Sequence, residues 1–431
     1  MPIRLNARDA NFEEAFAALL TGKREASVDV NDTVAKIVAD VRARGDEALV
    51  EYTRRFDRLP GLTVETLAIP KKDLDEAAAS CDPKTLDALK LAAARIEAYH
   101  IRQRPEDARF TDEAGVELGH RWTPVGAVGL YVPGGTANYP SSVLMNAIPA
   151  KVAGVKRIVM VVPTPDGVVN PLVLAAAKLA GVSEVYRVGG AQAVAALAYG
   201  TKTIAPVDKI VGPGNAYVAA AKRQVFGQVG IDMIAGPSEI LVVADGKNDP
   251  EWIAADLLSQ AEHDESSQSI LITDDAAFAA RVEEAVGRQL QALPRETTAT
   301  KSWADFGAVI LVERLGDAAP LVDRLAPEHL ELAVDDAEAL LSKIANAGAV
   351  FLGRYTPEAI GDYVAGSNHV LPTARSARFS SGLNVLDFMK RTSIVRCDAD
   401  ALRAIGPAAL ALAEAEGLDA HLRSVAIRLN L

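Results

Sequence analysis

The chain has 431 residues, which is too long for a single hydrophobic core and predicts two major domains with smaller appendages. Its 49% hydrophobic and 24% charged residues are typical of a soluble globular protein. The net charge of −12 argues against a nucleic-acid partner, and no apolar run is long enough to cross a membrane. Cys81 and Cys397 are too few for a disulfide framework, and the N-terminus carries no hydrophobic signal segment, so we expect a cytoplasmic protein.

The first part of the chain predicts helices. Residues 1–25 carry apolar side chains at helical spacing and predict a small N-terminal helical arm, which needs another part of the protein or a partner subunit to pack on. A broken helix is expected over residues 31–56 and a longer one over residues 82–104. We interpret the two histidines of this part, His100 and His120, as structural residues.

From residue 124 onward, strands and helices alternate. The expected strands are 125–132, 157–162, 184–188 and 209–211, and the expected helices are 142–153, 171–180 and 216–225. Glycine-rich turns follow three of these strands, at 133–135, 189–192 and 212–215. This pattern predicts an open parallel sheet with helices on both faces, whose ligands bind outside the carboxyl ends of the strands. The dinucleotide motif G-x-G-x-x-G is absent, so the turns alone leave nucleotide binding open.

A second alternating section begins at residue 238. Its expected strands are 238–243, 269–273, 308–312 and 349–352, and its expected helices include one that opens at 249–250 and others over 275–291 and 335–347. The fold class is therefore α/β, with two side-by-side, open, mostly parallel, incomplete Rossmann-like domains and a ligand cleft between them. We divide the chain into an N-terminal arm (1–25), a core domain (26–130 and 238–380), a second α/β domain (131–237) and a C-terminal tail (381–431) that lacks strands and is helical.

The helix that opens at Asp249-Pro250 carries two unusual polar residues. Gln260 falls in the middle of its apolar face, and His263 falls at the edge of that face. An amide and an imidazole directed inward need partners, because an unpaired buried polar group costs about 1–3 kcal/mol. They are either ordinary core residues that hydrogen-bond within the domain, or two ligands of a metal ion separated by one helical turn.

Three further places collect groups that can handle protons or bind metals. Glu328-His329 pairs a carboxylate with an imidazole, which suits proton transfer but also arises by chance in structural positions. Asp362 precedes the flexible stretch that contains Asn368-His369. Glu416 and His421 flank Gly417, which can break a helix and let both side chains face one way.

Taken together, six tracts resemble the histidinol dehydrogenase family. They are Gly189–Ala193, Gly212–Asn215, Ile234–Glu239, Leu258–His263, Ala326–Leu332 and the stretch from Gly361-Asp362 to Thr373. They occur in order over essentially the whole chain, and their joint occurrence is far more specific than any one of them.

The resemblance implies a function for each matching residue. Gln260, His263, Asp362 and His421 correspond to the ligands of one catalytic zinc ion per subunit, a ligand set that also leaves manganese or cobalt open. Glu328 and His329 correspond to the catalytic pair that handles protons. Tyr131, Gln192 and Asn215 match positions that contact NAD. The substrate-binding positions are Ser238, Gln260, His263, His329, Asp362, Glu416 and His421.

The implied reaction is the four-electron oxidation of L-histidinol to L-histidine through L-histidinaldehyde, with two molecules of NAD⁺ used in turn. The resemblance also implies a homodimer in which the C-terminal tail contributes to the site of the neighbouring subunit. Three alternatives remain at this stage: another NAD-dependent alcohol or aldehyde dehydrogenase, a zinc hydrolase, and a metal-binding protein without catalytic activity. The sequence gives no function for His369.

Overall fold

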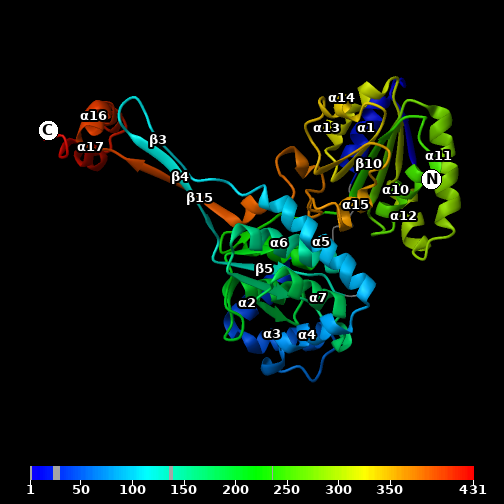
Figure 1. Ribbon diagram of the computed structural model, residues 1–431, viewed down its shortest axis with the longest axis horizontal. Helices are drawn as coiled ribbons and strands as arrows, with labels where there is room; N and C mark the ends of the chain where they lie inside the picture. Colours follow the sequence, from blue (N-terminus) through cyan, green and yellow to red (C-terminus); the bar gives the residue numbers. More distant parts are fainter. Residues whose placement is uncertain (1, 23–29, 135–138, 235) are drawn as a thin grey trace.

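The computed structural model describes residues 2–22, 30–134, 139–234 and 236–431. It consists of two α/β domains and a projecting arm (Figure 1). The first domain is built on a six-stranded parallel sheet in the order β1-β12-β11-β10-β13-β14. These strands are β1 (Ile3–Asn6), β10 (Glu239–Ala244), β11 (Gln268–Thr273), β12 (Ala308–Leu311), β13 (His329–Ala333) and β14 (Ala349–Leu352).

Helices cover both faces of this first sheet. Leu241 and Val243 of β10 pack on one face with α1 (Phe12–Thr21), α13 (Ala319–Leu325) and α14 (Ala337–Leu341). Ile240 and Val242 point to the other face, toward α10 (Pro250–Ala261), α11 (Ala276–Leu290) and α12 (Glu296–Phe306). Successive residues of a strand alternate between faces, so a strand buried on both faces is apolar throughout. The short helix α15 (Glu358–Tyr363) follows β14.

The second domain is also doubly wound, in the order β2-β7-β6-β5-β8-β9, and only β2 is antiparallel to its neighbour. Its strands are β2 (Ala68–Ile69), β5 (Ala127–Tyr131), β6 (Arg157–Val161), β7 (Glu184–Tyr186), β8 (Lys209–Val211) and β9 (Gly230–Ile231). One face carries α4 (Lys71–Ser80), α5 (Pro83–Ile101), α6 (Pro140–Ala153) and α7 (Pro171–Ala180). The other carries α2 (Asn31–Arg44), α3 (Asp46–Phe56), α8 (Gly190–Tyr199) and α9 (Ala216–Val225).

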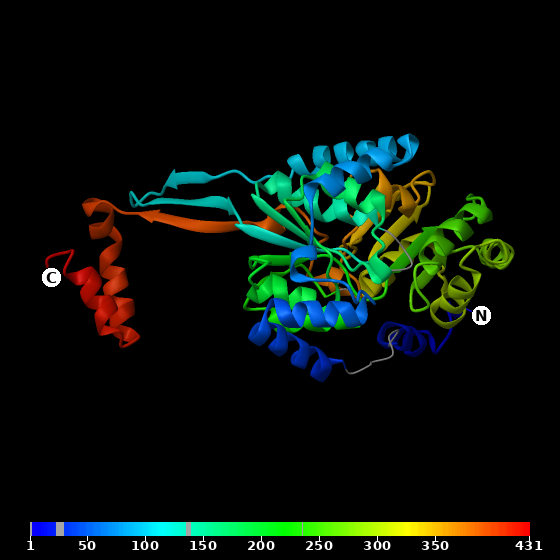
Figure 2. The same ribbon diagram turned by 90° about the horizontal axis from the view of Figure 1, so that it is seen from below.

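An arm projects from the body of the molecule. β4 (Glu117–Pro124) pairs along its whole length with β15 (Met389–Arg396), and β3 (Ala108–Thr111) adds a third antiparallel strand. The arm ends in α16 (Ala399–Ala415) and α17 (Asp419–Ala426), which lie far from both domains (Figures 1 and 2). Its apolar side chains Phe110, Val395 and Leu412 are more than half exposed. Within the described ranges, no helix is both long enough and apolar enough to span a membrane.

The predicted fold class, two side-by-side and mostly parallel α/β domains, is confirmed. The expected division of the chain needs correction, because residues 26–130 do not join residues 238–380. Instead, β2 pairs with β7, and α2 to α5 pack on the helices and strands of the second domain. The reason is that these helices bury their apolar faces on the sheet nearest to them in sequence.

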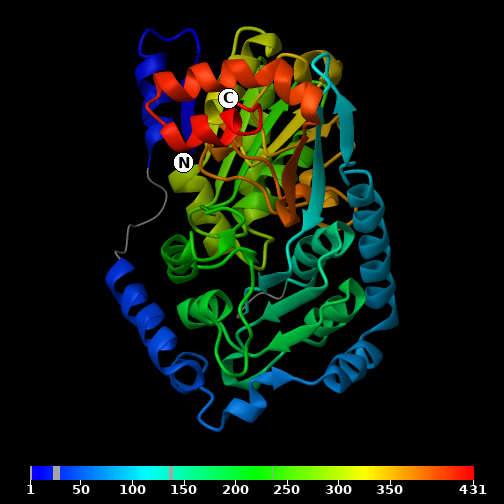
Figure 3. The same ribbon diagram turned by 90° about the vertical axis from the view of Figure 1, so that its left-hand side faces the viewer.

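Both ends of the chain also differ from expectation. Residues 1–25 were expected to form a helical arm that packs on another part of the protein or on a partner subunit. The helix α1 does pack on the first sheet, but residues 3–6 form β1, an edge strand of that sheet, while α2 lies on the second domain (Figure 3). Residues 381–431 were expected to lack strands, but β15 contributes eight residues to the sheet of the arm. The helix expected over 335–347 is reduced to the five residues of α14.

Candidate active site

A cleft of about 1180 Å³ lies between the two domains. Asn215 lines it from the second domain, and Ser238, His263, Glu328, His329 and Asp362 line it from the first. The second sheet meets the cleft with the carboxyl ends of its strands, since the cleft-lining turn 212–215 follows β8. The first sheet meets it with amino ends, because Glu239 and His329 are the first residues of β10 and β13. The cleft therefore lies at the carboxyl ends of the second sheet, for which the sequence predicted ligand binding, and at the amino ends of the first sheet, for which no end was predicted.

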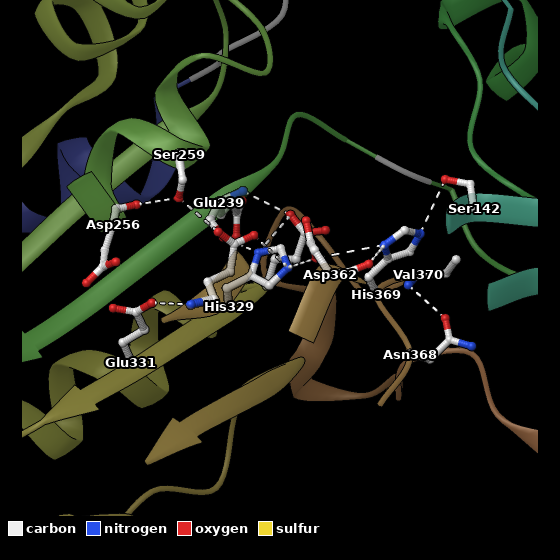
Figure 4. Close-up of polar contacts among 12 residues, drawn as sticks. Ser142, Glu239, Asp256, Ser259, His329, Glu331, Asp362, Asn368, His369 and Val370 are labelled. Atoms are coloured by element: carbon white, nitrogen blue, oxygen red, sulfur yellow. Dashed lines mark hydrogen bonds and ion pairs between the residues drawn. The ribbon is translucent and has the colours of Figure 1, made fainter. Parts of the chain in front are cut away.

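His329 is held in one tautomer by the neighbouring strand. Its Nδ1 lies 3.0 Å from the carbonyl oxygen of Glu239, so Nδ1 carries the hydrogen and donates it. In the neutral ring Nε2 is then the basic nitrogen, and it lies 3.6 Å from Glu358 Oε1 and 3.8 Å from Asp362 Oδ1 (Figure 4). The adjacent Glu328 accepts the N–H of Glu239 at 2.9 Å.

Buried carboxylates surround this imidazole. Glu358 accepts the Ser259 hydroxyl at 3.0 Å, and its own backbone N–H donates to Glu331 at 2.6 Å. Burial, reinforced by the charge of Glu358, raises the pKa of Asp362 to about 7. Burial and the neighbouring Asp256 likewise raise the pKa of Glu331 well above its usual value. Because several buried carboxyl groups lie close together with little positive charge near them, this site favours a bound cation.

The donor atoms available for a metal are nitrogen and oxygen. Among the described residues, the ligand atoms of His329, Glu358 and Asp362 lie within 4.8 Å of one another. Gln260, near the end of α10, is fully buried, and neither its amide oxygen nor its amide nitrogen has a hydrogen-bond partner in the described part of the chain. His263 follows the same helix and is exposed to the cleft. The inward direction predicted for Gln260 is thus observed, and its amide is left without a partner.

The three residues expected to contact the cofactor lie at the carboxyl ends of strands or just beyond them. Tyr131 ends β5, and its hydroxyl oxygen accepts the N–H of Gly190 at 3.0 Å; burial raises its pKa to about 12. Gln192, in the first turn of α8, is buried and has no partner for either amide atom among the described residues. Asn215 is exposed and caps α9 by accepting the backbone N–H groups of residues 217 and 218.

Two predicted site residues lie elsewhere in the chain. Glu416 follows α16 and His421 lies on α17, both exposed at the far end of the arm (Figure 1). Within one chain they are remote from the cleft that Asn215, His329 and Asp362 line. Tyr131, Gln192 and Gln260 do not line that cleft either. Neither cysteine lines the cleft: Cys81 is partly buried after α4, and Cys397 is exposed in the arm.

The structure shows contacts to His369, to which the sequence assigned no function, and adds Ser142, which the sequence patterns did not single out. His369 donates from Nδ1 to the carbonyl oxygen of Asp362 at 3.1 Å, and its Nε2 accepts the hydroxyl of Ser142 at 3.3 Å, which links the two domains across the cleft. Burial lowers the pKa of His369 to about 4, so its ring is neutral at physiological pH. One signal for the acidic cluster was available, because Glu331 interrupts an otherwise apolar buried strand.

Comparison with known proteins decides the family. The family model for histidinol dehydrogenase matches residues 20–429. The chain belongs to the histidinol dehydrogenase family. It is 68% identical to the histidinol dehydrogenase of Mesorhizobium japonicum over all of both chains, and 69% identical to that of Rhodospirillum rubrum over all of this chain and 99% of the relative.

A crystal structure of the histidinol dehydrogenase from Elizabethkingia anophelis superposes with a TM-score of 0.95 at 36% identity, covering 100% of this chain and 98% of that one. The expected family and fold class are therefore confirmed. As a histidinol dehydrogenase, the chain is an oxidoreductase of histidine biosynthesis that oxidises histidinol to histidine with NAD. The cluster of nitrogen and oxygen ligands in the cleft accords with the metal that this family implies.

Proposed function

We propose that the chain carries out the whole four-electron oxidation of L-histidinol to L-histidine in the cleft between its domains, through L-histidinaldehyde. The observation that carries this proposal is the pairing of two proton acceptors in one place. His329 offers the basic Nε2, which accepts no hydrogen bond from a described residue, and Glu328 lies beside it in the same wall of the cleft. The first oxidation needs a base that deprotonates the alcohol, and the second needs a base that deprotonates water. Two neighbouring acceptors can divide these tasks, whereas a single acceptor would have to perform both in turn.

In the first oxidation, His329 Nε2 removes the hydroxyl proton of the alcohol. A hydride leaves the same carbon, and the products are the aldehyde, NADH and a proton. In the second, Glu328 removes a proton from water as the water oxygen bonds to the aldehyde carbon, and the carbonyl oxygen takes up a proton, which gives the hydrate. Transfer of a second hydride to NAD⁺ and release of two protons convert the hydrate to the carboxylate. NAD supplies the hydride acceptor for each step, and Tyr131, Gln192 and Asn215 are the residues that we assign to hold it.

We propose zinc as the metal, one ion per subunit, held by Gln260, His263 and Asp362 together with His421 of the partner subunit. When bound, zinc supplies an orienting template and a Lewis acid for the substrate. The orphaned amide of Gln260 supports this set, because a buried amide without a partner costs free energy that coordination removes. The same set, with Ser238, His329 and Glu416, forms the binding site for histidinol.

We infer that the enzyme is a homodimer in which the arm of one subunit completes the cleft of the other. Glu416 and His421 are exposed at the end of an arm that cannot bring them to the cleft of their own chain. The exposed apolar residues of the arm, among them Phe110, Val395 and Leu412, support a partner surface that covers them. We assign the metal site to the first domain and the NAD site to the second domain.

The experiment that tests the function is the yield of NADH per L-histidinol, with and without a chelator. We expect two NADH per substrate, loss of turnover on chelation, and recovery when zinc is added back. One NADH per substrate would reduce the enzyme to an alcohol dehydrogenase and remove the function assigned to Glu328. Recovery with manganese or cobalt but not with zinc would overturn the choice of metal alone.

A further inference from the structure

Glu358 has one carboxylate oxygen held by the protein and one directed at the proposed base. The side chain is 2% exposed. Its Oε2 accepts the Ser259 hydroxyl at 3.0 Å, whereas Oε1 has no hydrogen-bond partner in the described part of the chain and lies 3.6 Å from His329 Nε2. His329 Nε2 is itself buried without a hydrogen-bond partner there. Two acceptor atoms therefore face each other across a short gap, and a proton on Nε2 would give both of them a partner.

The backbone fixes the position of this carboxylate. The N–H of Glu358 donates to Glu331 at 2.6 Å, which ties the first turn of α15 to the middle of β13, the strand that begins with His329. The same strand therefore carries the imidazole and the anchor of the acid. The imidazole is further limited by the Phe351 ring, 6.2 Å away between centroids, and by its hydrogen bond to the Glu239 carbonyl. On the remaining side, Nε2 has the carboxylates of Glu358 and Asp362 beside it, at 3.6 and 3.8 Å.

We propose that Glu358 is the positioning residue of His329 during alcohol oxidation, an inference that rests on the function proposed for His329. The O–H bond of the substrate breaks and an N–H bond forms at Nε2. The resulting imidazolium donates that hydrogen to Glu358 Oε1, which keeps the ring in place and holds the proton away from the aldehyde until it leaves for solvent. Supporting residues that orient a reacting imidazole in this way typically change rates or affinities by about 10–100-fold.

A competing function for Glu358 is metal ligation, since its carboxylate lies within reach of the same metal as Asp362. The two functions predict different losses on Glu358→Gln, which keeps the shape of the side chain and removes its charge. If Glu358 positions His329, the substitution lowers kcat and leaves the bound zinc in place. If Glu358 is a metal ligand, the substitution lowers the zinc content of the dialysed enzyme.

The test compares purified zinc-loaded enzyme, Glu358→Gln and the matched control Glu338→Gln, which makes the same change on the exposed surface of α14. We expect Glu358→Gln to lower kcat about 10–100-fold with KM for NAD and zinc content unchanged. We expect the control to match wild type. Ser259→Ala, which removes the hydroxyl that holds Oε2, should lower kcat about threefold to tenfold and serves if the first variant does not fold.

A double-mutant cycle with His329→Asn separates an effect through His329 from a general structural one. We expect the double variant to turn over no more slowly than His329→Asn alone, because Glu358 has then lost the group on which it acts. Three outcomes would overturn this inference but leave the base proposed for His329 in place. They are additive losses in the double variant, loss of zinc from Glu358→Gln, and a wild-type kcat in Glu358→Gln when His329→Asn is inactive. Full turnover by His329→Asn would overturn the proposed base and, with it, this inference.

Discussion

Gln192 buries an amide that makes no hydrogen bond to any described residue, although it lies in the first turn of a helix with apolar surroundings. Such a group destabilises the cofactor-free protein by about 1–3 kcal/mol. The contact with NAD that we propose for Gln192 would supply the missing partner. Under that proposal, Gln192 lowers the stability of the cofactor-free protein and contributes to cofactor binding.

Gln192→Leu is expected to raise the unfolding free energy of the NAD-free enzyme by about 1 kcal/mol, because the orphan amide is removed. The same change should abolish the rise in melting temperature that NAD gives to the wild-type enzyme. Thermal unfolding with and without NAD measures both effects. The control is Gln289→Leu, whose amide nitrogen donates to Glu251 at 2.7 Å, so that this change should destabilise. Destabilisation by both changes would show that Gln192 has a structural partner.

At the residue scale, the sequence predicted which side chains point into the core better than it predicted the functions of the site residues. The helical period placed Gln260 on the apolar face of α10, and the structure buries it. The functions of Glu328 and His329 came only from the family resemblance, since a Glu-His pair has no distinctive spacing. Glu358 was missed because its importance arises from an encounter with His329 that no local pattern encodes.

At the scale of elements, the short helix α15 fixes the positions of two acidic side chains of the site. Glu358 and Asp362 are one turn apart on it, and Gly361 brings the helix against Phe351. A Cβ at residue 361 would lie 2.4 Å from the phenyl ring, which is closer than atoms can approach without movement. The absence of a side chain at this position sets the distance between α15 and β14.

Gly361→Ala is therefore expected to displace α15 and reduce kcat by at least about tenfold, since displacements near 1 Å at a site have effects of that size or larger. The melting temperature should also fall, because overpacking costs about 1–3 kcal/mol. Gly287→Ala in α11 is the matched control: a Cβ there meets nothing within 4 Å, and alanine favours helix. Wild-type kinetics in Gly361→Ala would show that α15 tolerates the shift.

Elements with local start signals were predicted well, and elements that depend on distant partners were not. The helix α10 begins where Asp249 accepts the N–H of Glu251, as the Asp-Pro pair indicates. β15 was missed because its residues Met389–Arg396 are mostly polar and exposed, so neither burial pattern nor alternation marks it. Its structure comes from pairing with β4, a segment that lies far earlier in the sequence.

At the scale of the whole molecule, the arm predicts a site shared between subunits. Glu328→Gln and His421→Ala are each expected to be inactive as homodimers, because each site lacks one essential group. Mixed under conditions that allow subunit exchange, they should regain activity. Each hybrid dimer then has one cleft with both Glu328 and a partner that supplies His421.

The recovered rate approaches one quarter of the wild-type value at equal mixing, since about half of the dimers are hybrids and each has one intact site. A control mixture of Glu328→Gln with Gly361→Ala, whose changes both lie in the body of the subunit, should recover nothing. Absence of recovery in the first mixture, with subunit exchange verified by mass, would mean that each chain completes its own cleft.

The pairing of β1 with β12 has a consequence for the order in which the protein takes shape on the ribosome. Ile3 pairs with Ala308, so β1 can pair with β12 only after about 300 further residues have been made. The sheet of the second domain lies entirely between residues 68 and 231 and can form in the meantime. During synthesis, all strands of the second sheet thus emerge before the first sheet can be completed, although β1 belongs to the first sheet.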